Sequence, residues 1–164
     1  RSPKEIPAAQ PRTIWGEEQK NWFMETFEES DATFKILFSP TPVVGPDREK
    51  KRDNHANNLF EEEGNWLRGF LSDNKGVFVV NGDRHWQYYS IDEATGLREF
   101  GAGPVSDAQS GGWSQDDKRP EHQYLRVNGG FLGIKVFLES NNPKINFTHY
   151  DVKGNVMNQE EFEN

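Results

Sequence analysis

The residues best suited to chemistry in this sequence are an aspartate and a histidine that follow a run of apolar residues. They lie in the stretch "GVFVVNGDRHWQYYS", residues 76–90, where Asp83 and His85 come just after Gly82. In an extended turn, residues i and i+2 project to the same side, so both side chains could reach one cation or a close pair of cations. A carboxylate and an imidazole together suit zinc, iron or manganese better than calcium or magnesium. The bare pattern also fits an aspartate that caps a turn and a histidine that packs on the surface.

The segments before this turn predict an α/β arrangement. A helix is expected over residues 16–30, where Trp22, Phe23 and Phe27 fall on one face, followed by a short apolar strand over 33–40. Prolines and charges predict a loop over 40–58, and a second apolar stripe predicts a helix over 59–71 before the strand "GVFVVNG". Ligands of α/β sheets bind beyond the carboxyl ends of the strands, which is where the turn would lie.

The second half of the sequence predicts antiparallel strands. Residues 86–103 form a candidate hairpin with a turn at 93–96, and at least three more strands are expected over 123–157, with "VKGN" as a tight turn. The predicted fold class is therefore α/β, with a mixed sheet, flanking helices and a C-terminal antiparallel meander. Residues 1–12 are interpreted as an arm or linker, 13–157 as one domain and 158–164 as a polar tail.

The composition limits the possible functions. Of 164 residues, 33% are hydrophobic and 13% are aromatic, so large rings can supply a core despite the low apolar content. The net charge of -8 excludes a broad basic surface for nucleic acid or anionic lipid. No apolar run reaches membrane-spanning length. The absence of cysteine excludes disulfides and thiolate zinc sites.

Several separated motifs, in this order, resemble the C-terminal part of PhoD-type alkaline phosphatases of the metallophosphatase superfamily. The motifs span Thr13 to about Met157 and read "IWGEEQKNWFMETFEESDATFKILFSPTPVVGP", "DNHAN…EEEGNWLRGFL", "GDRHWQY", "TGLREFGAGPVSD" and "YLRVNGGFLGIKV". The resemblance implies a phosphoester hydrolase, a phosphatase or phosphodiesterase, with two metal ions on a sandwich of two mixed sheets. Iron, calcium, manganese or zinc could be these ions, and the family implies export to the periplasm or the cell exterior.

The resemblance also implies roles for single residues. Residues 82–85 match the last metal motif of the superfamily, where most members have Gly-His-x-His. The resemblance therefore implies that Asp83 and His85 are metal ligands. Asn54 and His55 match a loop directed towards the active site. We expect Asn54 to line the substrate site and His55 to protonate the leaving alkoxide. Arg84 could bind a substrate phosphate oxygen or pair with an acidic side chain, and both interpretations remain open.

The same resemblance predicts that the chain is only part of an enzyme. Nothing in residues 1–35 supplies the earlier metal motifs of the superfamily, and the sequence starts with Arg1 rather than methionine, which suggests a processed or excised piece. We expect the chain to be inactive without an N-terminal half and to form homodimers through exposed sheet edges. The alternative is a non-catalytic binding or structural module that kept the fold and lost the chemistry.

The remaining histidines and the aromatic residues after the motif are interpreted as structural. His122 lies beside a charged loop, and His149 is expected to face solvent or a strand neighbour. Trp86, Tyr88 and Tyr89 are expected to form the wall and core beneath the site.

Overall fold

The first half of the chain has the predicted order of helix, strand, loop, helix and strand. The computed structural model describes residues 12–163. Its first elements are α1 (Gly16–Glu29), β1 (Lys35–Ser39), the short helix η1 (Asn58–Phe60), α2 (Glu61–Ser72) and β2 (Val77–Asn81). Residues 40–57 form the expected irregular loop. Apart from Arg12, the expected N-terminal arm lies outside the described residues.

The turn at residues 82–85, which contains Asp83 and His85, follows β2 of a five-stranded mixed sheet. This sheet adds β3 (Gln87–Ile91), β4 (Arg98–Ala102) and β5 (His122–Arg126), and its strand order is β1-β2-β4-β3-β5. The strands β1, β2 and β4 run parallel, whereas β3 is antiparallel to β4 and β5. The predicted hairpin of β3 and β4 is confirmed. A second short helix, η2 (Asp107–Gln109), lies in the loop before β5.

The last strands form a separate antiparallel sheet. It has the order β6-β7-β8, with β6 (Gly130–Glu139), β7 (Asn142–Asp151) and β8 (Val156–Glu163). The turn between β7 and β8 is the predicted tight one, because Gly154 has a φ of 85° and donates its N–H to the Asp151 carbonyl at 3.1 Å. Residues 158–163, expected to be a polar tail, form most of β8, and Phe162 packs against the core.

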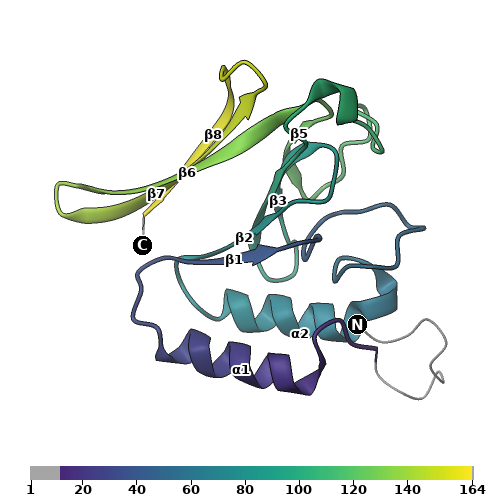
Figure 1. Cartoon of the computed structure of the whole chain (residues 1–164). Helices are drawn as coiled ribbons and strands as arrows, with labels where there is room; N and C mark the ends of the chain where they lie inside the picture. The colour runs from purple at the N-terminus through teal and green to yellow at the C-terminus, as the bar shows by residue number, and fades with distance from the viewer. Residues whose placement is uncertain (1–11, 164) are drawn as a thin grey trace.

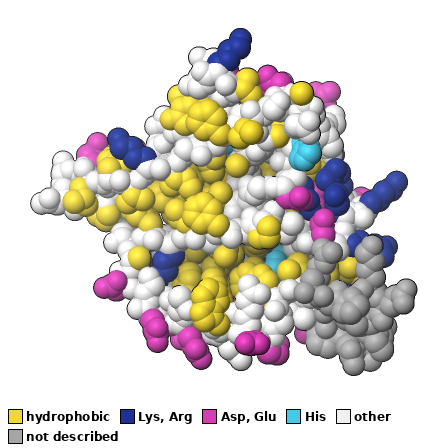
Figure 2. Space-filling view, viewed as in Figure 1, with side chains coloured by type: hydrophobic (Ala, Val, Ile, Leu, Met, Phe, Trp, Pro, Cys, Tyr) yellow, Lys and Arg dark blue, Asp and Glu magenta, His cyan; other side chains and the backbone are white. Residues whose placement is uncertain are grey.

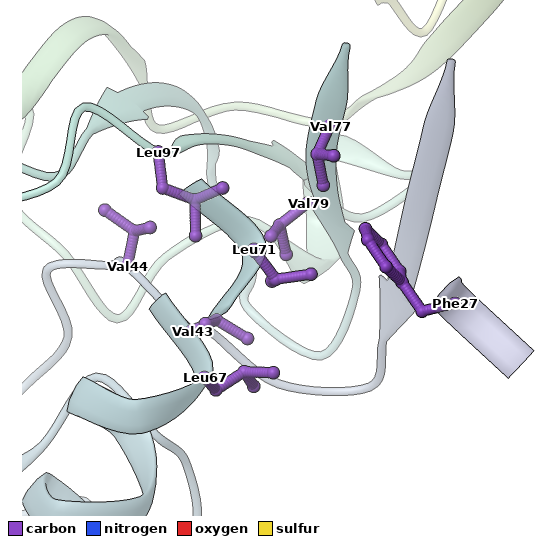
Figure 3. Packing of buried hydrophobic residues seen from close by; sticks show 8 residues of the cluster. All are labelled: Phe27, Val43, Val44, Leu67, Leu71, Val77, Val79 and Leu97. Atoms are coloured by element: carbon purple, nitrogen blue, oxygen red, sulfur yellow. The ribbon is translucent and has the colours of Figure 1, made fainter. Parts of the chain in front are cut away.

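The five-stranded sheet is covered on both faces (Figure 1), by α1 and α2 on one side and by the β6–β8 sheet on the other. Because side chains alternate along a strand, β2 serves both layers. Val77 and Val79 pack against the helices (Figure 3), and Phe78 and Val80 face the second sheet. The second interface consists largely of rings, with Phe100 stacked on Phe147 at a centroid distance of 4.1 Å.

Both structural histidines are buried. His149 was expected to face solvent or a strand neighbour, and this was wrong. Its imidazole is fully buried between the two sheets, where Nε2 lies 3.1 Å from the Gly101 carbonyl oxygen. His122 is 2% exposed and accepts the Arg119 N–H at Nδ1. Burial lowers the pKa of each imidazole to about 4. An alternating pattern indicates which strand face a residue occupies, but not that another sheet covers that face.

Strand β1 lies at an edge of the sheet. Among the described residues it pairs only with β2, and Phe38 on this strand is 68% exposed. A groove of about 440 Å³ lies between β1 and α1 and includes Trp22, which is 61% exposed. Hydrophobic side chains gather on this part of the surface and on the β6–β7 hairpin (Figure 2). None of the described helices is both long and apolar enough to cross a membrane.

Candidate functional site

The turn at residues 82–85 begins directly after β2, at the carboxyl end of the parallel part of the sheet. Asp83 has a φ of 50°, a left-handed conformation that aspartate adopts more readily than bulky or β-branched residues. Exposure alternates along the turn, because Asp83 and His85 reach solvent while Arg84 and Trp86 are buried. The two candidate metal ligands are therefore both accessible. The turn is not extended, contrary to the expectation from the sequence, because Asp83 is left-handed.

Arg84 is buried beneath the turn and is surrounded by carboxylates. Its Nε and Nη2 donate to Asp47 Oδ2 at 2.9 and 2.6 Å, and Nη2 also donates to Asp53 Oδ1 at 2.8 Å. Its Nη1 pairs with the Asp83 carboxylate. Burial by itself would lower the pKa of Arg84, but the charges and hydrogen bonds of Asp47 and Asp53 raise it. Of the two roles considered for Arg84, the structure has the acid-paired one.

The Asp83 carboxylate is thereby attached to a buried charged group and still reaches solvent. Its side chain is 51% exposed although one oxygen pairs with Arg84. The imidazole of His85 makes no hydrogen bond or ion pair within residues 12–163, and the residue is exposed. These two side chains are thus available to a ligand, with Asp83 oriented by the group beneath it.

Asn54 supports the same charged cluster from the loop. Its amide nitrogen donates to Asp47 Oδ2 at 2.7 Å and to Asp53 Oδ1 at 2.9 Å, and its oxygen accepts the Ala56 N–H. The side chain is fully buried. Burial raises the pKa of Asp53, but hydrogen bonds from Asn54 and Arg84 outweigh it and lower that pKa overall. Within this structure Asn54 positions two acids that hold Arg84.

His55 lies in a different contact network from the residues of the turn. It is 2% exposed, its Nε2 lies 3.0 Å from Glu63 Oε2, and its ring meets Trp15 edge-on at 5.6 Å. Burial would raise the pKa of Glu63, but hydrogen bonds from His55, Thr13 and the Ile14 N–H lower it to about 2. The structure brings together Asp83, Arg84 and Asn54, whereas His55 joins the loop to α2 and the N-terminal segment.

The loop that carries Asp47 and Asn54 is fixed to the sheet by Glu99 of β4. This fully buried carboxylate accepts three successive backbone N–H groups, from Val43, Val44 and Gly45, at 2.6 to 2.9 Å. It also accepts the Tyr88 hydroxyl at 2.6 Å. Burial raises the pKa of Glu99, and these hydrogen bonds oppose the rise. Tyr88, Trp86 and Tyr89 are all buried, which confirms their structural interpretation.

Sequence reasoning missed the supporting acids. Asp47 and Asp53 lie among many charges in the 40–58 loop, where no spacing distinguishes a buried acid from a solvated one. Glu99 offered a better signal, because a charged residue in the middle of the short strand "REFGA" must be exposed or paired.

The described residues supply too few ligands for a complete two-metal centre. Two-metal catalysis requires a bridging carboxylate and enough ligands to hold both ions about 3.5–4 Å apart. Within residues 12–163, no group of three or more His, Cys, Asp or Glu side chains is placed to hold an ion. Asp83 and His85 have the donor types for one corner of such a centre, and the further ligands would have to come from outside this set.

Both the fold and the sequence of this chain are similar to those of known proteins. A solved structure described as "Structure of PhoD" is similar to this chain, with a TM-score of 0.59 and 15% sequence identity, a likeness that concerns the fold alone. The match covers 93% of this chain and 34% of that chain, so this chain spans about one third of its length. No curated protein matched. The family model of the PhoD-like phosphatases matches residues 2–159, and the chain therefore belongs to this family.

Proposed function

We propose that this chain supplies the C-terminal portion of a metal-dependent phosphoester hydrolase, with Asp83 and His85 as ligands of one metal ion. The observation that carries the proposal is the exposure of both side chains on the turn after β2, above a buried arginine that holds one of them. Family membership supports the reaction class. Bound metal ions would supply charge neutralisation for a phosphoryl group and an activated water.

The chain's own residues have positioning roles in this proposal. Arg84 orients the Asp83 carboxylate, and Asp47 and Asp53 hold Arg84 in place. Asn54 joins the two acids from the loop. All three carboxylates accept from one guanidinium, so a shift in Arg84 would move the Asp83 ligand. Substrate contact by Arg84 or Asn54 would require these side chains to leave their present partners.

Catalysis would need a further segment, because one turn offers only two ligands. The edge of β1, with Phe38 and Trp22 exposed beside it, gives such a segment a place to add a strand. A strand added there would lie in a sheet that is already covered on both faces, a situation typical of buried parallel strands. The expected homodimer would use the same edge in place of the missing half.

The test of this proposal is metal binding by the chain and by a longer form that includes the N-terminal half. Manganese or zinc should bind the longer form, measured by calorimetry, and nitrophenyl phosphate or bis-nitrophenyl phosphate should be hydrolysed. Asp83→Asn and His85→Ala should each weaken metal binding roughly 10- to 100-fold and abolish turnover. Asp116→Asn, an equal change of charge on an exposed loop, is the matched control.

Unchanged metal affinity in both site variants would refute the assignment of Asp83 and His85. The alternative, a non-catalytic module, is favoured by one observation, namely that Arg84 and Asn54 are occupied by protein partners. A longer form that folds and binds metal but hydrolyses neither substrate would support that alternative.

A further inference from the structure

The turn at residues 82–85 is held from the β2 side as well as through Arg84. Asn81, the last residue of β2, is 2% exposed, and its amide Nδ2 donates to the Tyr88 hydroxyl at 2.7 Å. That hydroxyl donates in turn to Glu99 Oε1 at 2.6 Å. One phenol oxygen therefore acts as donor and as acceptor, and joins the residue before the turn to the carboxylate that holds the loop.

A glycine on the strand between them allows this contact across the sheet. Asn81, Gly101 and Tyr88 lie in one row across β2, β4 and β3. A Cβ atom at position 101 would lie 2.2 Å from the Tyr88 ring, so the ring passes directly over the backbone of β4. A side chain at this position would push the ring aside and separate its hydroxyl from Asn81. The glycine in the strand "REFGA" thus permits the close approach.

The two supports of the turn meet at Glu99. Its carboxylate accepts the Tyr88 hydroxyl and also the N–H groups of residues 43–45, and Asp47, which holds Arg84, lies two residues further along the loop. The contacts therefore form a closed ring that begins and ends in the turn. Loss of the Tyr88 hydroxyl would open this ring and remove the acceptor of the buried amide at position 81, whose oxygen has no partner among the described residues.

We propose that Tyr88 is a positioning residue for Asp83 and His85, because its hydroxyl fixes the end of β2 against Glu99 and so determines where the turn places these two side chains. Core packing requires only the ring of Tyr88, whereas the hydroxyl and the bare glycine beneath the ring both serve the link to Asn81. The effect on the turn is independent of the proposed function. The effect on metal binding rests on it.

The first test is hydrogen exchange of single amides, followed by NMR, in the chain with Tyr88→Phe. The N–H groups of Arg84 and Gly111 donate to carbonyl groups of the turn and report on it. Their exchange should become about fivefold faster, because one intramolecular hydrogen bond is lost. The N–H of Gly154, which is bonded within the distant turn after β7, should exchange at its original rate.

Tyr89→Phe is the matched control. Tyr89 is buried on the same strand but faces the β6–β8 sheet, where its ring stacks on Phe100 at 4.6 Å. This variant should leave the exchange of Arg84 and Gly111 unchanged. Equally fast exchange in both variants, or an equal rise at Gly154, would mean a general loss of stability and would overturn the inference. Unchanged exchange of the turn in Tyr88→Phe would also overturn it.

Asn81→Leu breaks the same link from its other end and keeps a similar side-chain volume. It should accelerate exchange in the turn by a similar factor. The double variant of Asn81→Leu and Tyr88→Phe should exchange no faster than either single variant, because both remove the same hydrogen bond. Additive effects would show that the two side chains act separately, which contradicts the link.

Metal binding by the longer form that includes the N-terminal half gives the second readout. Tyr88→Phe should weaken manganese binding about tenfold, measured by calorimetry, and Tyr89→Phe should not change it. An unchanged affinity in Tyr88→Phe beside a loss in Asp83→Asn would overturn the positioning role. If the turn is loosened but neither Tyr88→Phe nor Asp83→Asn changes the affinity, the hold on the turn is confirmed and the assignment of Asp83 as a metal ligand fails.

Discussion

Two of the turns that contain an aspartate, those after β7 and after β2, use it in opposite ways. In the turn after β7, Asp151 accepts the N–H groups of Lys153 and Asn155 and the Asn155 amide, all from its own turn. In the turn after β2, the Asp83 carboxylate pairs with Arg84, which two further acids hold from the loop. The first aspartate shapes its own backbone. The second is supported by distant segments and presents its remaining oxygen to solvent, which is the arrangement a ligand site needs.

The largest expected effect comes from removing the buried support of the Asp83 turn. Arg84→Ala removes the buried cation that Asp47 and Asp53 contact at 2.6 and 2.8 Å, and breaking a buried pair in this way should cost about 3–5 kcal/mol of unfolding free energy. Urea denaturation followed by circular dichroism measures it. The comparison variant is Arg119→Ala, whose pair with Asp117 is exposed and should contribute far less to stability. Similar costs for both would show that burial of Arg84 is unimportant.

Acid should weaken the attachment of the 40–58 loop, which lies beside the Asp83 turn, more than it weakens the Asp151 turn. The pKa of Glu63 is lowered from 4.5 to about 2, so its stabilising contribution is complete above pH 4.5 and is lost as the pH falls towards 2. The loss should reach about 3 kcal/mol. Denaturation between pH 6 and 2 should therefore show a smaller decline for Glu63→Gln than for the wild type. Asp151→Asn should keep the wild-type decline over the upper part of this range, and a flat wild-type profile would contradict the prediction.

The smallest changes in stability are expected when the two aspartates themselves are replaced. Asp151→Ala removes three hydrogen bonds within its turn and should lower the unfolding temperature measurably, but by less than Arg84→Ala does. Asp83→Asn keeps the side-chain shape at a half-exposed position, and we expect a change within about 0.5 kcal/mol. Thermal unfolding of both variants checks this order. A greater loss for Asp83→Asn would mean that this aspartate is structural as well.

Most of the fold could be predicted from the sequence, because the relevant signals are local. The apolar face of α1 and the hairpin turn after Ile91 follow from residues close together in the chain. The exposure of Asp83 and His85 agrees with a polar turn after an apolar strand, which is also a local signal. The burial of Arg84 and His149 does not follow from local signals, because it depends on segments about 30 or more residues away in sequence that cover them. Composition shows that such polar residues exist, but only the tertiary arrangement selects those that lose contact with water.

The attachment of the loop to Glu99 has a consequence for motion. Three successive backbone amides share one carboxylate, so the loop cannot slide along the sheet by giving up one hydrogen bond at a time. Displacement of the segment would leave the buried Glu99 carboxyl and all three backbone amides without these hydrogen bonds at the same time. Rearrangement at this end of the molecule should therefore be all-or-none, with the loop either seated on β4 or fully released.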